Sequence, residues 1–162
     1  MIKKSISLFS GAMGLDLGLE NAGFQTVACV ENDTDAIKTI QQNRPDITTF
    51  SKSITEVTGE EILQETGLSQ SEISLIAGGP PCQAFSVFGN RLGLEDARGQ
   101  LVFEFIRMVE EIRPPVFLME NVRGILSMAI VPKNSESDTS LPEHKGKGSL
   151  MDLIFKEMNS TD

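Results

Sequence analysis

The sequence lacks any apolar run close to the roughly 20 residues that a helix needs to cross a bilayer. Its first residues, 1–4, lead directly into a strand pattern and do not resemble a signal peptide. Cysteine is scarce, and the separation of Cys29 from Cys82 fits neither a disulfide scaffold nor a zinc site. We therefore expect a cytoplasmic protein that folds in a reducing compartment and binds no metal.

Positive charge is also scarce. The chain has 14 Lys and Arg residues against 23 Asp and Glu residues, which gives a net charge of −9. A domain that binds DNA by itself carries a basic face, because each phosphate contact draws on Lys or Arg. The composition therefore argues against a self-sufficient DNA-binding domain. The one histidine, His144, lies in a polar segment, and we assign it no role.

The sequence does contain an alternation of short β-like runs with helical stretches. Its 162 residues, 40% of them hydrophobic, suit one domain with a core of moderate size. The expected strands cover residues 6–9, 26–30, 47–50, 73–77 and 116–119. The expected helices cover residues 15–22, 33–44, 59–66 and 100–112. Such alternation predicts an α/β fold, with a parallel sheet, right-handed crossovers and helices on both faces.

The pattern changes after residue 126. Residues 1–126 contain every expected strand and form the predicted domain core. Residues 127–148 are rich in Pro, Ser and Gly, which is typical of a polar, mobile surface loop. Residues 149–162 return to helical spacing, and we expect them to form the terminal helix of the same domain.

Four unusual segments follow expected strands: residues 9–14, 31–33, 78–86 and 120–122. In open parallel sheets, ligands bind beyond the carboxyl ends of the strands. The first segment is a glycine-rich turn, and Glu31 follows about 20 residues later, where an acid suits a ribose diol. This pair fits a nucleotide or S-adenosylmethionine equally well. The alternative is a tight strand–helix turn, with Glu31 as a solvated acid that begins a helix.

Cys82 follows a strand end in a stiff Pro-Pro turn, whereas Cys29 lies within an apolar strand as a structural cysteine does. That position exposes the Cys82 thiol at the functional edge of the sheet, where a nucleophile needs access and a favoured thiolate. Glu120 follows another strand end and could act as an acid if its pKa is raised. The alternative role for Glu120 is a helix cap or a loop hydrogen bond.

Three motifs together carry a family resemblance. Pro-Pro-Cys-Gln at positions 80–83, Glu-Asn-Val at 120–122 and Phe-Ser-Gly at 9–11 resemble, in order and spacing, the motifs of DNA cytosine-5 methyltransferases. The resemblance covers residues 5–126, with a weaker match in the last helix. It implies a Rossmann-like, S-adenosylmethionine-dependent methyltransferase fold that is incomplete at its C-terminal end.

The resemblance also implies roles for individual residues. Cys82 attacks C6 of a flipped-out cytosine, and Glu120 contacts N3 and the exocyclic amine, so that C5 becomes nucleophilic and takes the methyl group. Asn121 helps to hold the turn near Cys82. The residues expected at the S-adenosylmethionine site are Phe9, Ser10, Gly11, Gly14, Glu31, Asn32, Ile54, Gly79 and Leu101. Those expected to contact the DNA substrate are Pro81, Gln83, Ser86 and Arg91.

Residues 86–99 match the position of the family's mobile loop that closes over DNA, although a plain exposed loop is the alternative. Two residues depart from the family pattern. Met13 stands where a second glycine is usual, and Ser53 stands where an aspartate usually reaches the adenine amine. We expect a modest effect from the first departure and weaker cofactor affinity from the second.

A larger departure is the absence of the Gln-x-Arg-x-Arg motif, the target-recognition domain and the final cofactor-domain segment. The acidic composition agrees with this absence. We therefore expect DNA as a partner, a second polypeptide as a possible source of the missing parts, and an exposed apolar edge that causes oligomerisation or marginal stability.

Three other functions remain open from the sequence. The chain could be an inactive remnant that still binds S-adenosylmethionine, or an RNA cytosine-5 methyltransferase of the same family. It could also be a nicotinamide or flavin oxidoreductase, but hydride transfer needs neither the prolyl-cysteine motif nor Glu-Asn-Val.

Overall fold

The computed structural model describes residues 2–81, 97–127, 148, 151–152 and 154–156. By its contacts the chain divides into two units. The first contains residues 1–80 and 104–120, and the second contains residues 81–103 and 121–162. The sheet and the pocket described below both lie in the first unit. No helix among the described residues is long and apolar enough to span a membrane.

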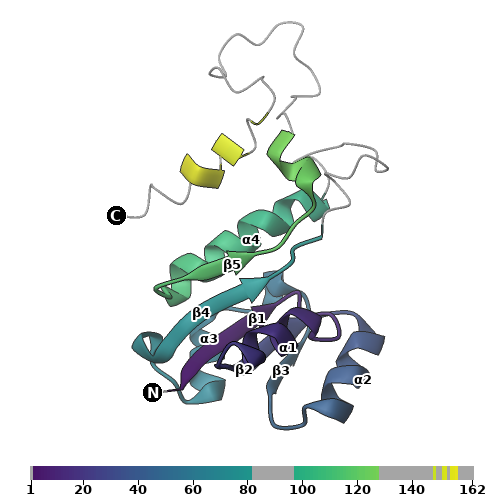
Figure 1. Cartoon of the computed structure of the whole chain (residues 1–162), viewed down its shortest axis with the longest axis vertical. Coiled ribbons are helices and arrows are strands. Elements are labelled where there is room, and N and C mark those ends of the chain that lie inside the picture. The colour runs from purple at the N-terminus through teal and green to yellow at the C-terminus, as the bar shows by residue number, and fades with distance from the viewer. Residues whose placement is uncertain (1, 82–96, 128–147, 149–150, 153, 157–162) are drawn as a thin grey trace, which may run out of the picture. The chain divides into compact units, whose positions relative to one another are not determined.

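The first unit is built on a five-stranded parallel sheet (Figure 1). The strands are β1 (Lys3–Leu8), β2 (Phe24–Glu31), β3 (Thr48–Ser51), β4 (Ile73–Gly78) and β5 (Phe117–Met119), in the order β3-β2-β1-β4-β5. The chain builds outward from β1 to β3 and then returns to place β4 on the other side of β1. The topological switch point therefore lies between β1 and β4, which is where such sheets form ligand sites.

Four α-helices accompany the strands: α1 (Gly14–Asn21), α2 (Thr34–Asn43), α3 (Gly59–Thr66) and α4 (Ala97–Ile112). Right-handed crossovers put α1 and α2 on one face of the sheet and α3 on the other, because the direction of strand addition reverses after β3. Figure 1 shows α1 in front of the strands and α4 behind them. The predicted parallel α/β architecture is confirmed.

Local signals in the sequence set the helix boundaries. Asp33 caps α2 by accepting hydrogen bonds from the backbone N–H groups of Asp35 and Ala36, at 3.0 and 2.8 Å. Thr58 caps α3 through the N–H of Glu61, and Gly67 ends that helix at a φ of 65°. Short 3-10 turns precede α3 and β4 at Ile54–Glu56 (η1) and Gln70–Glu72 (η2), and another covers Arg123–Ser127 (η4).

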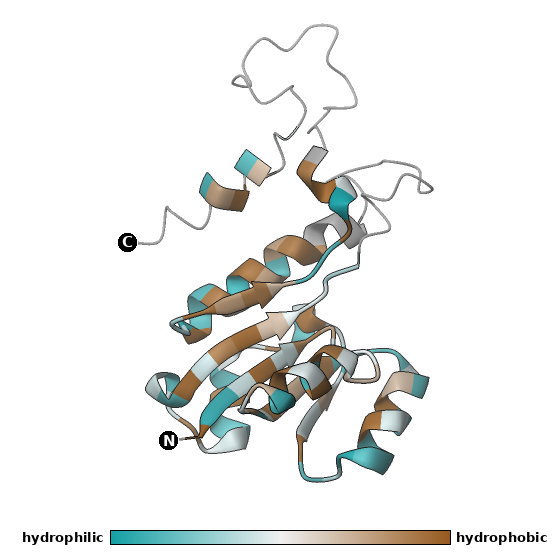
Figure 2. Ribbon diagram, in the orientation of Figure 1, coloured by the Kyte–Doolittle hydropathy of each residue, from teal (hydrophilic) through white to brown (hydrophobic). Residues whose placement is uncertain are grey.

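The core lies between the sheet and its helices. Ile6, Leu8 and Ile76 of the central strands are fully buried, and Figure 2 shows hydrophobic residues along β4 and β5. Phe105 of α4 packs edge-on against Phe117 of β5, with ring centroids 6.2 Å apart. Cys29 is buried in β2, and burial raises the pKa of its thiol, so it is a packing residue, as predicted.

The expected exposed apolar edge is present at β5. Among the described residues, β5 pairs only with β4, through a register that aligns Ile76 with Phe117 and Gly78 with Met119. Leu118 within the strand is 41% exposed, and Val116 just before it is 58% exposed. Within the described part of the chain, β5 is thus an edge strand with exposed apolar side chains beside it.

Several boundaries differ from the sequence prediction. β1 ends at Leu8 and not at Phe9, because Phe9 has a φ of 53°, which no strand residue adopts. α4 begins at Ala97, three positions earlier than predicted. Of the predicted terminal helix, residues 151–152 and 154–156 are described and helical. The predicted division into a core, a polar loop and a terminal helix stays a prediction, since residues 128–147 lie outside the described part of the chain.

Candidate functional site

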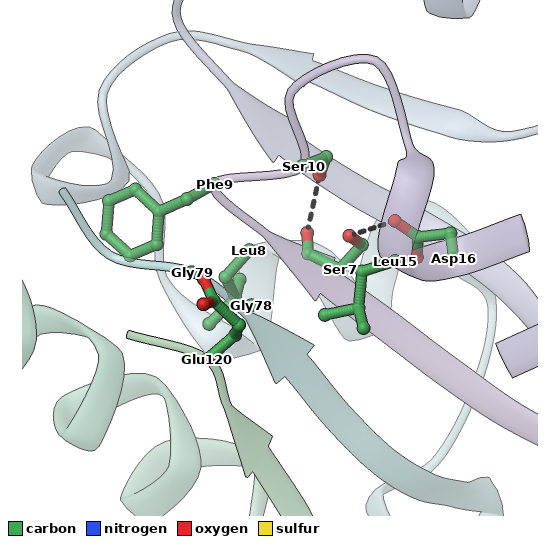
Figure 3. A pocket seen from close by; sticks show the side chains of 9 residues that line it. All are labelled: Ser7, Leu8, Phe9, Ser10, Leu15, Asp16, Gly78, Gly79 and Glu120. Carbon is green, nitrogen blue, oxygen red and sulfur yellow. Dashed lines mark hydrogen bonds between the residues drawn. The ribbon is translucent and has the colours of Figure 1, made fainter. Parts of the chain in front are cut away.

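A pocket of about 200 Å³ lies at the carboxyl ends of β1, β4 and β5 (Figure 3). This is the switch point of the sheet. The residues that line it are Ser7, Leu8, Phe9, Ser10, Leu15, Asp16, Gly78, Gly79 and Glu120. Four of the predicted site residues, from segments that are far apart in the sequence, are therefore brought together: Phe9, Ser10, Gly79 and Glu120.

The turn after β1 forms one wall of this pocket and has an unusual backbone. Phe9, Gly11 and Met13 have φ values of 53°, 52° and 64°, so every second residue is left-handed. The Ser10 hydroxyl donates to the carbonyl of Ser7 at 3.2 Å, and the Met13 N–H donates to the carbonyl of Ser10 at 2.8 Å. Strain at Phe9 and Met13 costs on the order of 1–3 kcal/mol each, and such strain is concentrated at functional sites.

Glu31 holds this turn in place from the end of β2. Its Oε2 accepts from the Gly11 N–H at 2.7 Å, and its Oε1 accepts from the N–H groups of Asn32 and Asp33, each also at 2.7 Å. The carboxylate therefore joins two loops through charge-assisted hydrogen bonds. One acceptor position on Oε2 remains for another donor. The pocket lining does not include Glu31, Gly11 or Asn32, but the hydrogen bonds among them hold the turn that forms its wall.

Two glycines let the strand ends come close together. A Cβ on Gly78 would lie 2.2 Å from the carbonyl oxygen of Leu8, so only glycine allows β4 to approach β1 at the floor of the pocket. A Cβ on Gly79 would lie 3.2 Å from Oε2 of Glu120. The Glu120 carboxylate thus lies over the backbone of Gly79. The backbone N–H of Glu120 donates to the Gly78 carbonyl at 2.9 Å.

Five lining residues were not predicted from the sequence: Ser7, Leu8, Leu15, Asp16 and Gly78. Of these, Asp16 is the one that carries an ionisable side chain. It is 1% exposed, and its carboxylate accepts from the Ser7 hydroxyl at 2.8 Å and from the Thr26 hydroxyl at 3.0 Å. Figure 3 shows the bond to Ser7. Burial raises the pKa of the Asp16 carboxyl, and these hydrogen bonds act in the opposite direction. The helix pattern did not reveal this burial, because the leucines of α1 occur at every second position and form no helical stripe.

The remaining predicted cofactor residues, Ile54, Gly14 and Leu101, are not among the lining residues of this pocket, and their predicted role stays a prediction. Ile54 is 3% exposed within η1 and is not among the lining residues. Its carbonyl accepts from Arg107 at 2.9 Å, so its segment is fixed to α4. Gly14 begins α1, where a Cβ would meet nothing within 4 Å. Leu101, in the first part of α4, belongs to the second unit.

The two departures from the family pattern have clear local roles. Met13 is 2% exposed and packs in a core cluster with Cys29, Ile40 and Ile47, so its side chain points away from the pocket. Ser53 caps η1, where its hydroxyl oxygen accepts from the Thr55 N–H at 3.4 Å. Neither residue is among those that line the pocket.

The other predicted catalytic and substrate residues are described only in part. Asn121 accepts the Val122 N–H on its side-chain oxygen at 2.9 Å, and both residues belong to the second unit, as does Pro81. The nucleophile candidate and three substrate residues lie outside the described residues: Cys82, Gln83, Ser86 and Arg91. Their predicted roles stay predictions.

The pocket has an acidic lining. Asp16 and Glu120 both contribute carboxyl groups, and the described residues that line the pocket include no Lys, Arg or His. An acidic wall with glycine backbone at its floor favours a ligand that carries positive charge and that needs close approach to the main chain.

Comparison with known proteins identifies the family. The profile of the C-5 cytosine-specific DNA methylases matches residues 3–133. The chain is 47% identical over 127 residues to Type II methyltransferase M.AquIA of Picosynechococcus sp., covering 78% of this chain and 51% of that protein. It is 43% identical over 120 residues to M.XorII of Xanthomonas oryzae pv. oryzae, covering 74% and 28%.

Solved structures agree. A putative DNA modification methyltransferase encoded within an Escherichia coli prophage superposes with a TM-score of 0.64 at 38% identity, covering 76% of this chain and 33% of that one. A Spodoptera frugiperda DNMT2 mutant superposes with a TM-score of 0.56 at 26% identity, covering 75% and 36%. This chain thus spans about half of M.AquIA and about a third of the others. The predicted resemblance is confirmed, and the chain belongs to the C-5 cytosine-specific DNA methylase family.

Proposed function

We propose that this chain is the catalytic and cofactor-binding part of a DNA cytosine-5 methyltransferase, which transfers a methyl group from S-adenosylmethionine to C5 of cytosine in DNA. The observation that carries the proposal is the position of Glu120. Its carboxylate lies over Gly79 at the switch-point pocket, and Cys82 follows three residues after Gly79 in the sequence. The family's acid and its nucleophile thus belong to the ends of neighbouring strands.

The pocket suits S-adenosylmethionine, which would supply an electrophilic methyl group on a cationic sulfur. The acidic lining formed by Asp16 and Glu120 complements that positive charge. Glu31 keeps one acceptor position on Oε2 for a ribose hydroxyl, while its other bonds hold the first turn in shape. Phe9 and Ser10 line the side of the pocket from that turn.

In the proposed reaction, the Cys82 thiolate attacks C6 of the cytosine and forms a covalent bond. Glu120 holds the protonated N3 and the exocyclic amine, so that electron density moves to C5 and C5 takes the methyl group. Loss of the C5 proton and of the cysteine then restores the ring. The base must leave the DNA stack to reach these groups. Asn121 holds the turn beside Cys82.

DNA recognition is proposed to depend on further protein. A net charge of −9 provides few phosphate contacts. A second polypeptide with a basic recognition domain would supply them. The exposed apolar side of β5 is a suitable place for part of it to pair.

The test is covalent trapping. The chain, alone and with a candidate complementing polypeptide, is incubated with S-adenosylmethionine and duplex DNA that contains 5-fluorocytosine at the target position. Fluorine at C5 cannot leave as a proton does, so the methylated adduct stays attached to the cysteine. We expect a denaturation-resistant adduct that Cys82→Ser abolishes, while Cys29→Ser retains it. An adduct with RNA and none with DNA would favour the RNA alternative, and cofactor binding without any adduct would favour the inactive remnant.

A further inference from the structure

Helix α1 has an inverted pattern of burial. Its fully buried residue is an acid, Asp16, which is 1% exposed, while Leu15 and Leu17 are 37% and 54% exposed. Helices normally direct their apolar residues to the core and leave acids in water, because burying a charge is costly. Asp16 also lines the pocket at the switch point. A buried acid in the wall of a ligand site needs an explanation beyond packing.

Asp16 is held in one position from two strands. The Ser7 hydroxyl of β1 donates to Oδ2 at 2.8 Å, and the Thr26 hydroxyl of β2 donates to Oδ1 at 3.0 Å. Thr26 in turn lies 3.3 Å from the hydroxyl of Ser5. Burial raises the pKa of the Asp16 carboxyl more than these neutral donors lower it, and the donors bring no positive charge that would stabilise the ionised form. The hydrogen bonds therefore fix the carboxylate in the pocket wall, but they do not balance its negative charge.

The cations nearby are used elsewhere. Among the described residues, no Lys or Arg forms an ion pair with Asp16. Arg44 pairs with Glu20, one turn further along α1, through two guanidinium nitrogens. Glu20 is itself an acid whose charge adds to that of Asp16. Arg44 still acts on Asp16 through space, but no described Lys or Arg forms an ion pair with it. A cationic ligand in the pocket would supply a closer positive charge.

We propose that Asp16 is a specificity-determining residue that makes this site prefer cationic S-adenosylmethionine to its neutral product, S-adenosylhomocysteine. The inference rests on the proposed function, because it assumes that S-adenosylmethionine occupies the pocket. The two molecules differ by one methyl group and by the positive charge on sulfur. A carboxylate fixed in a partly desolvated wall attracts that charge more strongly than water-exposed acids do. Asp16 therefore favours the replacement of bound S-adenosylhomocysteine by S-adenosylmethionine.

The test compares the dissociation constants of both ligands by calorimetry on the full chain, at about pH 8, where an aspartate is normally ionised. The variants are Asp16→Asn, which keeps the size and removes the charge, and Asp46→Asn, a matched change at an exposed acid outside the pocket. A third ligand, sinefungin, carries an amine in place of the methylsulfonium and separates the effect of charge from that of the methyl group. Thermal unfolding checks each variant, and Asp16→Ser provides a second neutral side chain if Asp16→Asn does not fold.

We expect Asp16→Asn to lower the preference for S-adenosylmethionine over S-adenosylhomocysteine by about tenfold, as expected for one charge pair at a partly buried site. The affinity for sinefungin should fall in parallel with the affinity for S-adenosylmethionine. Asp46→Asn should leave the ratio of the dissociation constants of S-adenosylmethionine and S-adenosylhomocysteine unchanged. If Asp16→Asn weakens both ligands equally, Asp16 is structural and the inference is overturned while the proposed function stands. If the wild-type chain binds none of the three ligands, the proposed cofactor site fails and the inference fails with it.

Discussion

Replacing Gly78 by alanine tests the claim that the pocket depends on close contact between β1 and β4. An added Cβ would lie 2.2 Å from the carbonyl oxygen of Leu8, 3.0 Å from its carbonyl carbon and 3.1 Å from its Cβ. Two of these atoms are backbone, so no side-chain rotation relieves the clash. Gly78 is also fixed on its other side, because it aligns with Met119 and its carbonyl accepts the Glu120 N–H at 2.9 Å.

The size of the effect follows from this geometry. The two strands must separate by about 1 Å to restore normal contact, and overpacking of this kind costs typically about 1–3 kcal/mol. For a chain of this length each kcal/mol lowers the Tm by about 2–4 °C, so we expect a Tm lower by roughly 2–12 °C. The separation also opens the floor of the pocket, so S-adenosylmethionine should bind more weakly than the loss of stability alone explains.

The assay is thermal unfolding followed by circular dichroism, with two glycine controls. Gly18 lies in α1 with nothing within 4 Å of its notional Cβ, so Gly18→Ala should raise the free energy of unfolding by about 0.5–1 kcal/mol. In Gly79→Ala the added Cβ would lie 3.2 Å from the carboxylate of Glu120 and 3.7 Å from the main-chain oxygen of Glu120. The Glu120 side chain can move away, so this variant should fold nearly as well as the wild type. If Gly78→Ala melts at the wild-type temperature, the proposed tight approach of β4 to β1 is wrong.

Three further predictions concern other contacts. Arg107 donates to two backbone carbonyls between β3 and α3, so Arg107→Met should lower the free energy of unfolding in urea by about 1–3 kcal/mol; an unchanged midpoint would show that water replaces these bonds. Glu31→Gln places an amide against backbone donors, so cofactor affinity should fall by about tenfold; equal binding would remove Glu31 from the site. The Ser69 N–H, with the Lys4 ammonium and the Ser69 hydroxyl, lowers the pKa of Glu72 from 4.5 to about 2. Its stabilising effect is therefore present above pH 4.5 and lost as the pH falls toward about 2, and Glu72→Gln should flatten the acid-unfolding curve in that range.

The sequence predicted the sheet because its signals are local. Short apolar runs that end at glycine or proline are readable without tertiary information, and parallel strands bring their ends to one edge. For this reason Phe9, Gly79 and Glu120 could be grouped from their positions at the ends of expected strands. Their grouping in one pocket is the part of the site that reasoning from the sequence captured.

The rest depended on packing that no local pattern expresses. In α1 the leucines occur at every second position, which is not a helical stripe, so the helix gave no reason to expect Asp16 inside. The hydrogen bond that the Gly11 N–H donates to Glu31 depends on the backbone of the turn, in which Phe9 and Gly11 are both left-handed. Arg107 donates to the carbonyl of the buried Ile54 and so fixes its segment to α4, a contact between distant parts of the chain that no local pattern expresses.

The strand order also fixes when the pocket can form during synthesis. β1 can pair with β2 early in synthesis, since Leu8 aligns with Val30. Its other neighbour, β4, is complete only when Gly78 has been added, and the last wall of the pocket only when Glu120 has been added. At about 5–20 residues per second, the interval between Leu8 and Glu120 lasts on the order of ten seconds on the ribosome. Until Gly78 has been added, one side of β1 has no strand beside it. The cofactor cannot guide these early steps, because its site does not yet exist, and it can protect only chains whose sheet is already assembled.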